Sequence, residues 1–302
     1  MQSTTKAYIS AIAANFIFGS SYAIVKYITP GFIHPFALNL VRVVVCIVLF
    51  WTLFLFKPGK IAIDKKDIPR FLWCALTGIV INQLLFIKGL SLTTVMHSSL
   101  LSLGAPIFIT IIAAWLLRER FTFPKALGLI CGISGAALLV LMKDNTHTGN
   151  NILLGDCLVL INAIAYAFYL VMVRPLMAKY SSIQVMRWIF TLGAIGILPF
   201  GLPHLLTTNW DAFETTHIIA LAYISVLGTF VAYLLTVYSI SAIGSSATGA
   251  FIYMQPIFAA ILAAIFMGEQ FSITKGIAAF LIFTGVYLVN FKKGDGSTAV
   301  DI

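Results

Sequence analysis

Charged residues are scarce in this chain of 302 residues, and acidic residues are the scarcest of all. Asp, Glu, Lys and Arg together make up 10% of the sequence, whereas soluble domains carry about 25%. Hydrophobic residues reach 60%, and the mean hydropathy is +1.01. Because a water-soluble fold cannot hide so much apolar surface, the composition excludes a soluble domain and predicts an integral membrane protein.

Sequence motifs for metal, nucleotide or covalent chemistry are also missing. The four cysteines fall in apolar runs without a C-x-x-C spacing, so they indicate neither a zinc site nor a disulfide framework. The absence of a P-loop motif excludes ATP as a direct energy source. An intramembrane enzyme would need a nucleophile, a base and an orienting group, and we expect none of the five histidines to face a deep serine or carboxylate. We therefore predict no catalytic residues, no metal and no cofactor.

Ten apolar runs of about 20 residues predict an all-α membrane protein with ten transmembrane helices. The first run has no cleavage site after it, so we expect a retained helix and not a signal peptide. The connections are too short to hold a soluble domain. The ten runs cover residues 7–28, 35–56, 70–90, 95–117, 123–142, 152–173, 182–203, 217–239, 246–267 and 272–291.

The sequence repeats itself in a register offset by 150 positions. Residues 105–143 recur as residues 255–293 without a gap, through a matching proline, glutamate, lysine and glycine. We interpret this as an internal duplication, with a first five-helix repeat over residues 1–146 and a second over residues 147–302.

Lysine and arginine positions predict how the helices are oriented. The net charge of +9 does not indicate a nucleic-acid partner, because the basic residues lie mostly in short connections between apolar runs. With the N-terminus inside, thirteen basic residues lie in the inner connections and tails, and only Lys143 and Lys275 lie in the outer ones. The positive-inside rule therefore places both termini in the cytoplasm. Since each half has an odd number of spans, we expect inverted repeats around a central cavity.

Four blocks of the sequence resemble the drug/metabolite transporter superfamily, specifically its EamA-type ten-helix members. Residues 106–121 and 256–271 are similar to the fourth and ninth helices of that family, residues 155–174 to the sixth, and residues 18–26 to the first. The resemblance implies two inverted five-helix repeats around a central cavity, transport by alternating access, and export of amino acids, metabolites or toxic compounds.

Polar and aromatic side chains recur at helical spacing inside the apolar runs, where each requires a partner or a cavity. Interhelical hydrogen bonding is the alternative for the deep amides, packing is the alternative for the serine, and interfacial anchoring is the alternative for tyrosines near span ends. The residues that we predict to line a substrate cavity are Asn15, Phe18, Tyr22, Asn82, Gln83, Ser102, Asn162, Tyr166, Tyr169, Tyr233 and Tyr253.

Five further residues are candidates for gating or hinge motion. Lys26 and Lys88 either extend along the apolar surface to reach water or form an outer gate with Asp156. Pro106 and Pro256 stand at matching places in the two halves, where each acts either as a hinge or as a static kink.

Four charged residues are expected to have other roles. Glu119 and Glu269 precede the fifth span of each half, where we expect them to accept from free amides at the helix start, with gating as the alternative. Arg42 and Arg187 lie near the start of the second span of each half, and we expect inner-leaflet or headgroup contact there rather than substrate contact. No Asp or Glu lies in the middle third of a span, which argues against a buried carboxylate relay for protons.

Together these features predict a secondary transporter, an exporter of small metabolites such as amino acids or drug-like compounds across the cell inner membrane. The aromatic and amide lining favours zwitterions or modest-sized organic molecules over bulk anions, since the sequence shows no cluster of central Arg or Lys. Facilitated diffusion and coupling through Asp156, His97 or the lysines are both open, and a membrane scaffold without transport is a further alternative. The predicted partners are a small-molecule substrate and the lipid bilayer, with no nucleic acid, and the chain is a monomer or a homodimer.

Overall fold

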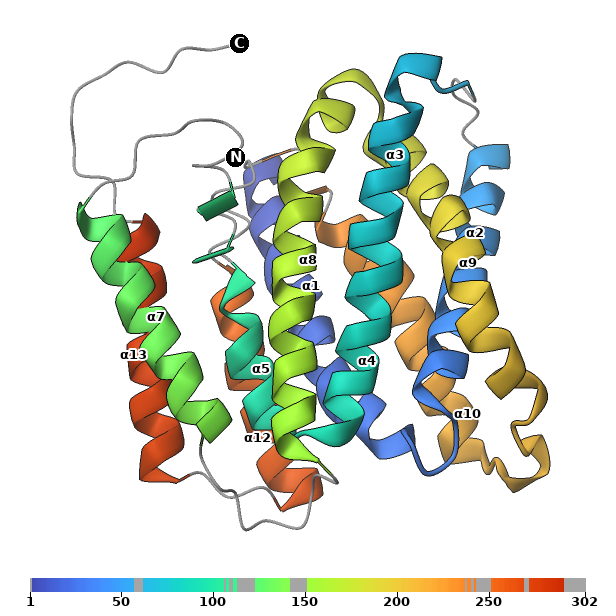
Figure 1. The fold of residues 1–302 in the computed structure, drawn as a ribbon. Helices are drawn as coiled ribbons and strands as arrows, with labels where there is room; N and C mark the ends of the chain where they lie inside the picture. The colour runs from blue at the N-terminus through green and yellow to red at the C-terminus, as the bar shows by residue number, and fades with distance from the viewer. Residues whose placement is uncertain are drawn as a thin grey trace.

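The computed structural model describes residues 2–56, 62–105, 107–108, 111–112, 123–141, 151–236, 238–239, 242, 251–268 and 272–290. Throughout these ranges the regular secondary structure is helical, as the all-α prediction requires (Figure 1). The α-helices run as α1 (Gln2–Ile28), α2 (Pro35–Phe56), α3 (Ile68–Ala75), α4 (Asn82–Leu92), α5 (Val95–Ser102), α7 (Phe123–Leu141), α8 (Ile152–Lys179), α9 (Ser182–Leu206), α10 (Thr215–Ala222), α12 (Gln255–Met267) and α13 (Ile273–Asn290).

Six of the described helical stretches are long and apolar enough to cross a membrane. Large apolar side chains such as Leu55, Phe123 and Ile273 are exposed on the outside of the bundle, as a lipid-facing surface requires. The chain is therefore a multi-pass membrane protein. The six stretches are Thr5–Ile28, Pro35–Phe56, Lys65–Leu92, Ile152–Met177, Ile183–Leu206 and Thr215–Thr236, and shorter apolar helices cover Ala126–Leu138, Gln255–Met267 and Ile273–Gly285.

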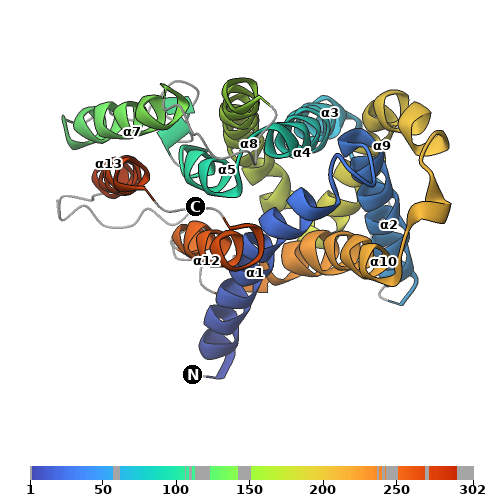
Figure 2. The same cartoon turned by 90° about the horizontal axis from the view of Figure 1, so that it is seen from below.

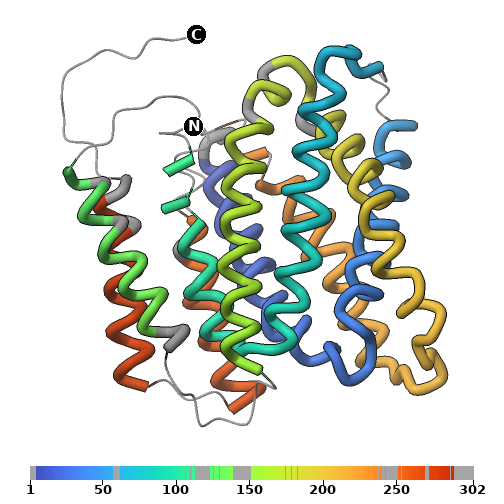
Figure 3. Tube along the Cα trace, in the orientation of Figure 1, coloured from blue at the N-terminus to red at the C-terminus, as the bar shows by residue number. Residues whose placement is uncertain are grey.

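Helices that are far apart in the sequence pack in pairs. The main contacts join α1 to α12, α2 to α9, α4 to α8, and α7 to α13. Viewed from below, α7, α8, α4 and α9 follow one side of the molecule, and α13, α12, α1 and α10 follow the other (Figure 2). The α7–α13 pair lies at one edge, and the path of α8 down the middle of the view can be followed in Figure 3.

Two of the long helical stretches contain a π-helical segment. The segment η2 (Leu76–Ile81) joins α3 to α4, and η4 (Tyr223–Val231) follows α10. With the 150-residue offset of the repeat, residues 76–81 of η2 correspond to residues 226–231, which lie within η4. π-helical turns occur frequently at functional sites, because they change the direction in which the following side chains point.

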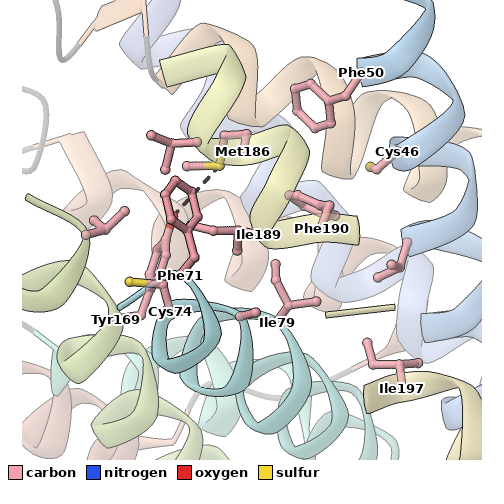
Figure 4. Close-up of a cluster of buried hydrophobic side chains, with 14 of the residues drawn as sticks. Cys46, Phe50, Phe71, Cys74, Ile79, Tyr169, Met186, Ile189, Phe190 and Ile197 are labelled. Atoms are coloured by element: carbon pink, nitrogen blue, oxygen red, sulfur yellow. Dashed lines mark hydrogen bonds between the residues drawn. The ribbon is translucent and has the colours of Figure 1, made fainter. Parts of the chain in front are cut away.

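A hydrophobic cluster holds α2, α3, α8 and α9 together (Figure 4). Phe50, Phe71 and Phe190 are fully buried in it. Tyr169 also lies there, with its hydroxyl donating to the sulfur of Met186 over 3.8 Å, so the structure places this residue in the packed core rather than on a cavity wall. The cluster fixes the helices that carry one side of the candidate site.

Candidate functional site

A cavity of about 190 Å³ lies inside the bundle, between α1, α2, α4, α5, α8, η4 and α12. At about 30 Å³ per water molecule, this volume corresponds to roughly six waters, which suits a small metabolite. The predicted residues on its wall are Phe18, Tyr22, Asn82, Gln83, Ser102, Asn162, Tyr166, Tyr233 and Pro256.

Helical spacing explains why these side chains meet. On α8, Asn162 and Tyr166 are four residues apart and point to the same side, because an α-helix turns once in about 3.6 residues. On α1, Phe18 and Tyr22 have the same spacing. The α4 residue Asn82 directly follows the η2 segment and also reaches the wall.

Aromatic rings form much of the wall. Phe18 and Tyr233 meet edge to face with ring centroids 6.0 Å apart, and Tyr22 meets Phe86 in the same way at 5.2 Å. These contacts join α1 to the helix after η4 and to α4. They offer a substrate an apolar surface, with the edges and faces of the rings available for specific contacts.

Amide side chains supply the polar part of the wall. The Asn82 side-chain nitrogen donates to the side-chain oxygen of Asn162 over 2.6 Å, which ties α4 to α8. Gln255, at the start of α12, also lines the cavity, and its side-chain nitrogen donates to Asn15 over 2.7 Å. Asn15 itself is buried and bonded to the backbone oxygen of Ala11, so it lies behind the wall as an interhelical contact.

Arg42 lines this site, although its place in the sequence indicated a role outside the cavity. Its side chain is 8% exposed and lines the cavity, so the expected contact with the inner leaflet or lipid headgroups is wrong. The only signal in the sequence was a permanent charge seven residues inside an apolar run. Arg187 is also buried, with its guanidinium over the rings of Trp51 and Phe54 at 4.7 and 4.1 Å.

A second polar cluster lies at the lower end of the bundle in Figure 1, where α4 ends and α8 begins. The Asp156 carboxylate is fully buried and accepts from the Thr93 hydroxyl and from Nδ1 of His97, the latter over 2.8 Å. We expected no histidine to face a deep serine or carboxylate; the carboxylate that His97 meets is buried, but it lies near the helix starts at one end of the bundle. Lys26 donates to the backbone oxygens of Leu90, Ser91 and Thr93, the shortest being 2.6 Å to Thr93.

The other predicted site residues lie away from the cavity wall or outside the described residues. Lys88 is partly buried near the end of α4, and Asp156 lies outside the cavity wall. Pro106, Glu119, Glu269 and the side chain of Tyr253 lie outside the described residues. In the part of the chain that the structure describes, no group of three His, Cys, Asp or Glu side chains is arranged to hold a metal ion.

The helical bundle and its internal polar cavity define a multi-pass membrane protein with room for a small solute. The profile of the EamA-like transporter family matches residues 5–141 and, a second time, residues 153–291. The chain belongs to this family.

Curated relatives agree with this assignment. The uncharacterized transporter YetK of Bacillus subtilis (strain 168) is 24% identical over 288 residues, which cover 95% of this chain and 87% of YetK. The uncharacterized inner membrane transporter YicL of Salmonella typhimurium is 26% identical over 309 residues, covering 96% and 97%. A probable terminal-alkyne amino-acid exporter of Streptantibioticus cattleyicolor is 26% identical over 228 residues, or 74% of each chain.

A protein of known crystal structure has a similar fold, with a TM-score of 0.62 and 16% sequence identity to this chain. The superposition covers 96% of this chain and 96% of that protein chain. At this identity the likeness establishes the fold alone. Because the family and the relatives are transporters, the chain is a membrane transporter and not an enzyme, as the sequence predicted.

Proposed function

We propose that the chain is a secondary transporter that exports small metabolites, such as amino acids or drug-like compounds, across the cytoplasmic membrane by alternating access. The observation that carries this proposal is the cavity of about 190 Å³, whose wall combines aromatic rings with the amides of Asn82, Gln83 and Asn162. Such a wall suits a solute with an apolar body and a few polar groups. The relative named as an amino-acid exporter supports this class of substrate at 26% identity.

The proposed architecture is ten spans in two inverted repeats, residues 1–146 and 147–302, with both termini in the cytoplasm. The 150-residue register of the sequence repeat supports it, as do the two π-helical segments at corresponding places. In this orientation the Asp156 cluster lies near the outer face and the α1 N-terminus near the inner face. A reporter fused to either terminus, active only in the cytoplasm or only outside, tests the orientation.

Flux measurements test the function. The purified protein in proteoliposomes is expected to give saturable flux for at least one member of a panel of amino acids, organic acids and cationic drugs. Asn162→Leu, on the cavity wall, is expected to reduce that flux, whereas Asn209→Leu, in an exposed loop, leaves it unchanged. A protein that folds but moves no member of the panel would contradict the proposal and favour a scaffold.

A further inference from the structure

The cavity wall contains a buried cation that has no acidic partner among the described residues. Arg42 lies on the wall at 8% exposure, and no Asp or Glu from the described residues lies on that wall or bonds to its guanidinium. A charge at this depth is costly in an apolar protein unless an opposite charge or strong hydrogen bonds meet it. The position is therefore suited to an anionic group that arrives with a ligand.

Two protein contacts fix the guanidinium and use only part of it. Nε donates to the Thr229 hydroxyl over 2.9 Å, and Nη1 donates to the Asn39 side-chain oxygen over 3.4 Å. The Thr229 hydroxyl in turn donates to the backbone oxygen of Ile224 within η4, so its lone pairs face Arg42. Because a guanidinium carries five N–H donors, the described residues leave most of the planar fork for a ligand.

Gln83 supplies a second unsatisfied group on the same wall. Its side chain is 3% exposed, and neither its amide nitrogen nor its amide oxygen has a hydrogen-bonding partner among the described residues. Asn39 links the two sites, since its side-chain nitrogen donates to the Gln83 backbone over 2.8 Å while its oxygen accepts from Arg42. Leaving a buried amide unpaired is unfavourable, which indicates that a ligand completes it.

We propose that Arg42 and Gln83 bind the carboxylate of the transported solute, and that the solute is a monocarboxylate with an apolar or aromatic body. A planar fork and a neighbouring amide N–H match the two oxygens of a carboxylate. A single cation matches a single negative charge, and the rings of Phe18, Tyr22 and Tyr233 surround the rest. With no acidic side chain among the described wall residues, an ammonium group is not required. This inference rests on the proposed transport function and names its substrate class.

Matched ligand sets test the inference on the full-length protein. One set is phenylalanine, phenylalaninamide, 3-phenylpropanoate and phenethylamine; the other is leucine, leucinamide, 4-methylpentanoate and isopentylamine. Binding is measured as thermal stabilisation in detergent, and transport as flux in proteoliposomes. At least one carboxylate-bearing member of a set is expected to bind and to be transported, whereas the amide and the amine are not.

Variants link this selectivity to the two residues. Arg42→Gln is expected to weaken carboxylate binding about tenfold or more, as loss of a charged hydrogen-bond partner does. Gln83→Leu weakens it less, and Arg42→Lys retains part of it. Arg70→Gln, an arginine away from the cavity, is the matched control and leaves binding unchanged.

The possible results distinguish failure of the carboxylate site from failure of the proposed transport function. Saturable flux of the amides or amines, or full carboxylate binding by Arg42→Gln, would overturn the carboxylate site while transport stands. Absence of both binding and flux across both sets would count against the carboxylate site, and absence of flux for the wider panel would also remove the transport proposal. Arg42→Lys supplies the test if Arg42→Gln does not fold.

Discussion

Asn82 of α4 and Asn162 of α8 share a hydrogen bond of 2.6 Å on the wall of the cavity. The two residues are 80 positions apart in the sequence. Their bond holds the two helices in register where a solute would contact them. Because both side chains are amides, each keeps donor or acceptor capacity for a ligand after the bond is made.

Breaking this bond is expected to affect both stability and transport. Asn82→Ala and Asn162→Ala should each lower the free energy of unfolding by about 1 kcal/mol, and the double variant should lose less than the sum. A double-mutant cycle in detergent measures this coupling. Asn209→Ala, in an exposed loop, is the control, and strictly additive losses would show that the pair is not coupled.

Close packing of α4 on α8 is expected to make Gly155 intolerant of larger residues. A Cβ atom there would lie 2.7 Å from the Thr93 backbone nitrogen and 2.8 Å from the Gly89 backbone oxygen. Because backbone atoms cannot move aside cheaply, Gly155→Val should destabilise the protein by about 1–3 kcal/mol.

Thermal unfolding in detergent checks the Gly155 prediction. Gly31→Ala is the matched control, since a Cβ atom at Gly31 meets nothing within 4 Å. If both variants unfolded at the same temperature, the close contact between α4 and α8 would be contradicted.

Removing the Asp156 carboxylate is expected to be strongly destabilising. Asp156 is fully buried and accepts from Thr93 and His97, so Asp156→Leu leaves two buried donors without their acceptor. Loss of one partner from a buried charged network typically costs about 3–5 kcal/mol. Expression level and melting temperature measure the effect, with Asp211→Leu in the exposed 3-10 turn Trp210–Ala212 as the control.

The pH dependence of stability is expected to involve His34. Burial, followed by the nearby charges of His204 and Lys88, lowers the pKa of His34 from 6.5 to about 4. Its ring is stacked on His204 with centroids 3.5 Å apart, and its Nδ1 accepts from the Phe36 backbone at the start of α2. Since the unfolded chain takes up this proton first, stability is fully present above pH 6.5 and falls as the pH drops towards 4.

The His34 prediction is checked by melting temperatures between pH 4 and pH 8. His34→Gln should flatten the fall between pH 6.5 and pH 4 and leave the difference between pH 7 and pH 8 unchanged. If the melting temperature fell by the same amount between pH 6.5 and pH 4 in the wild type and in His34→Gln, groups other than His34 would cause the fall.

The sequence predicted the helices well because apolar length determines them. The second run was predicted over residues 35–56, which are the bounds of α2, and the sixth run begins at Ile152, where the Asn151 side chain caps the helix. Eight of the eleven predicted cavity residues lie on the wall. Polar side chains in a membrane span face the interior of the bundle or a cavity, because exposing them to lipid is costly. Tyr169 does not lie on the wall, because a tyrosine can equally be packed in a core.

Long-range contacts were beyond sequence reasoning. The His97–Asp156 pair forms because α5 and α8 both begin at the same end of the bundle, 59 positions apart in the chain. The Arg42 side chain points inward because its guanidinium donates hydrogen bonds to Thr229 and Asn39. Thr229 lies in a π-helical segment, which a hydropathy pattern does not reveal.

The η2 segment also determines which side of α4 a solute would meet. A π turn accommodates an extra residue, so rewinding Leu76–Ile81 as ordinary α-helix, with no residue removed, would rotate one half of the helix relative to the other by about 100°. The rewound helix would still be apolar and long enough to span a bilayer. Its amides would face lipid or a neighbouring helix, so the protein would keep its path through the membrane and lose the polar lining that Asn82 and Gln83 provide.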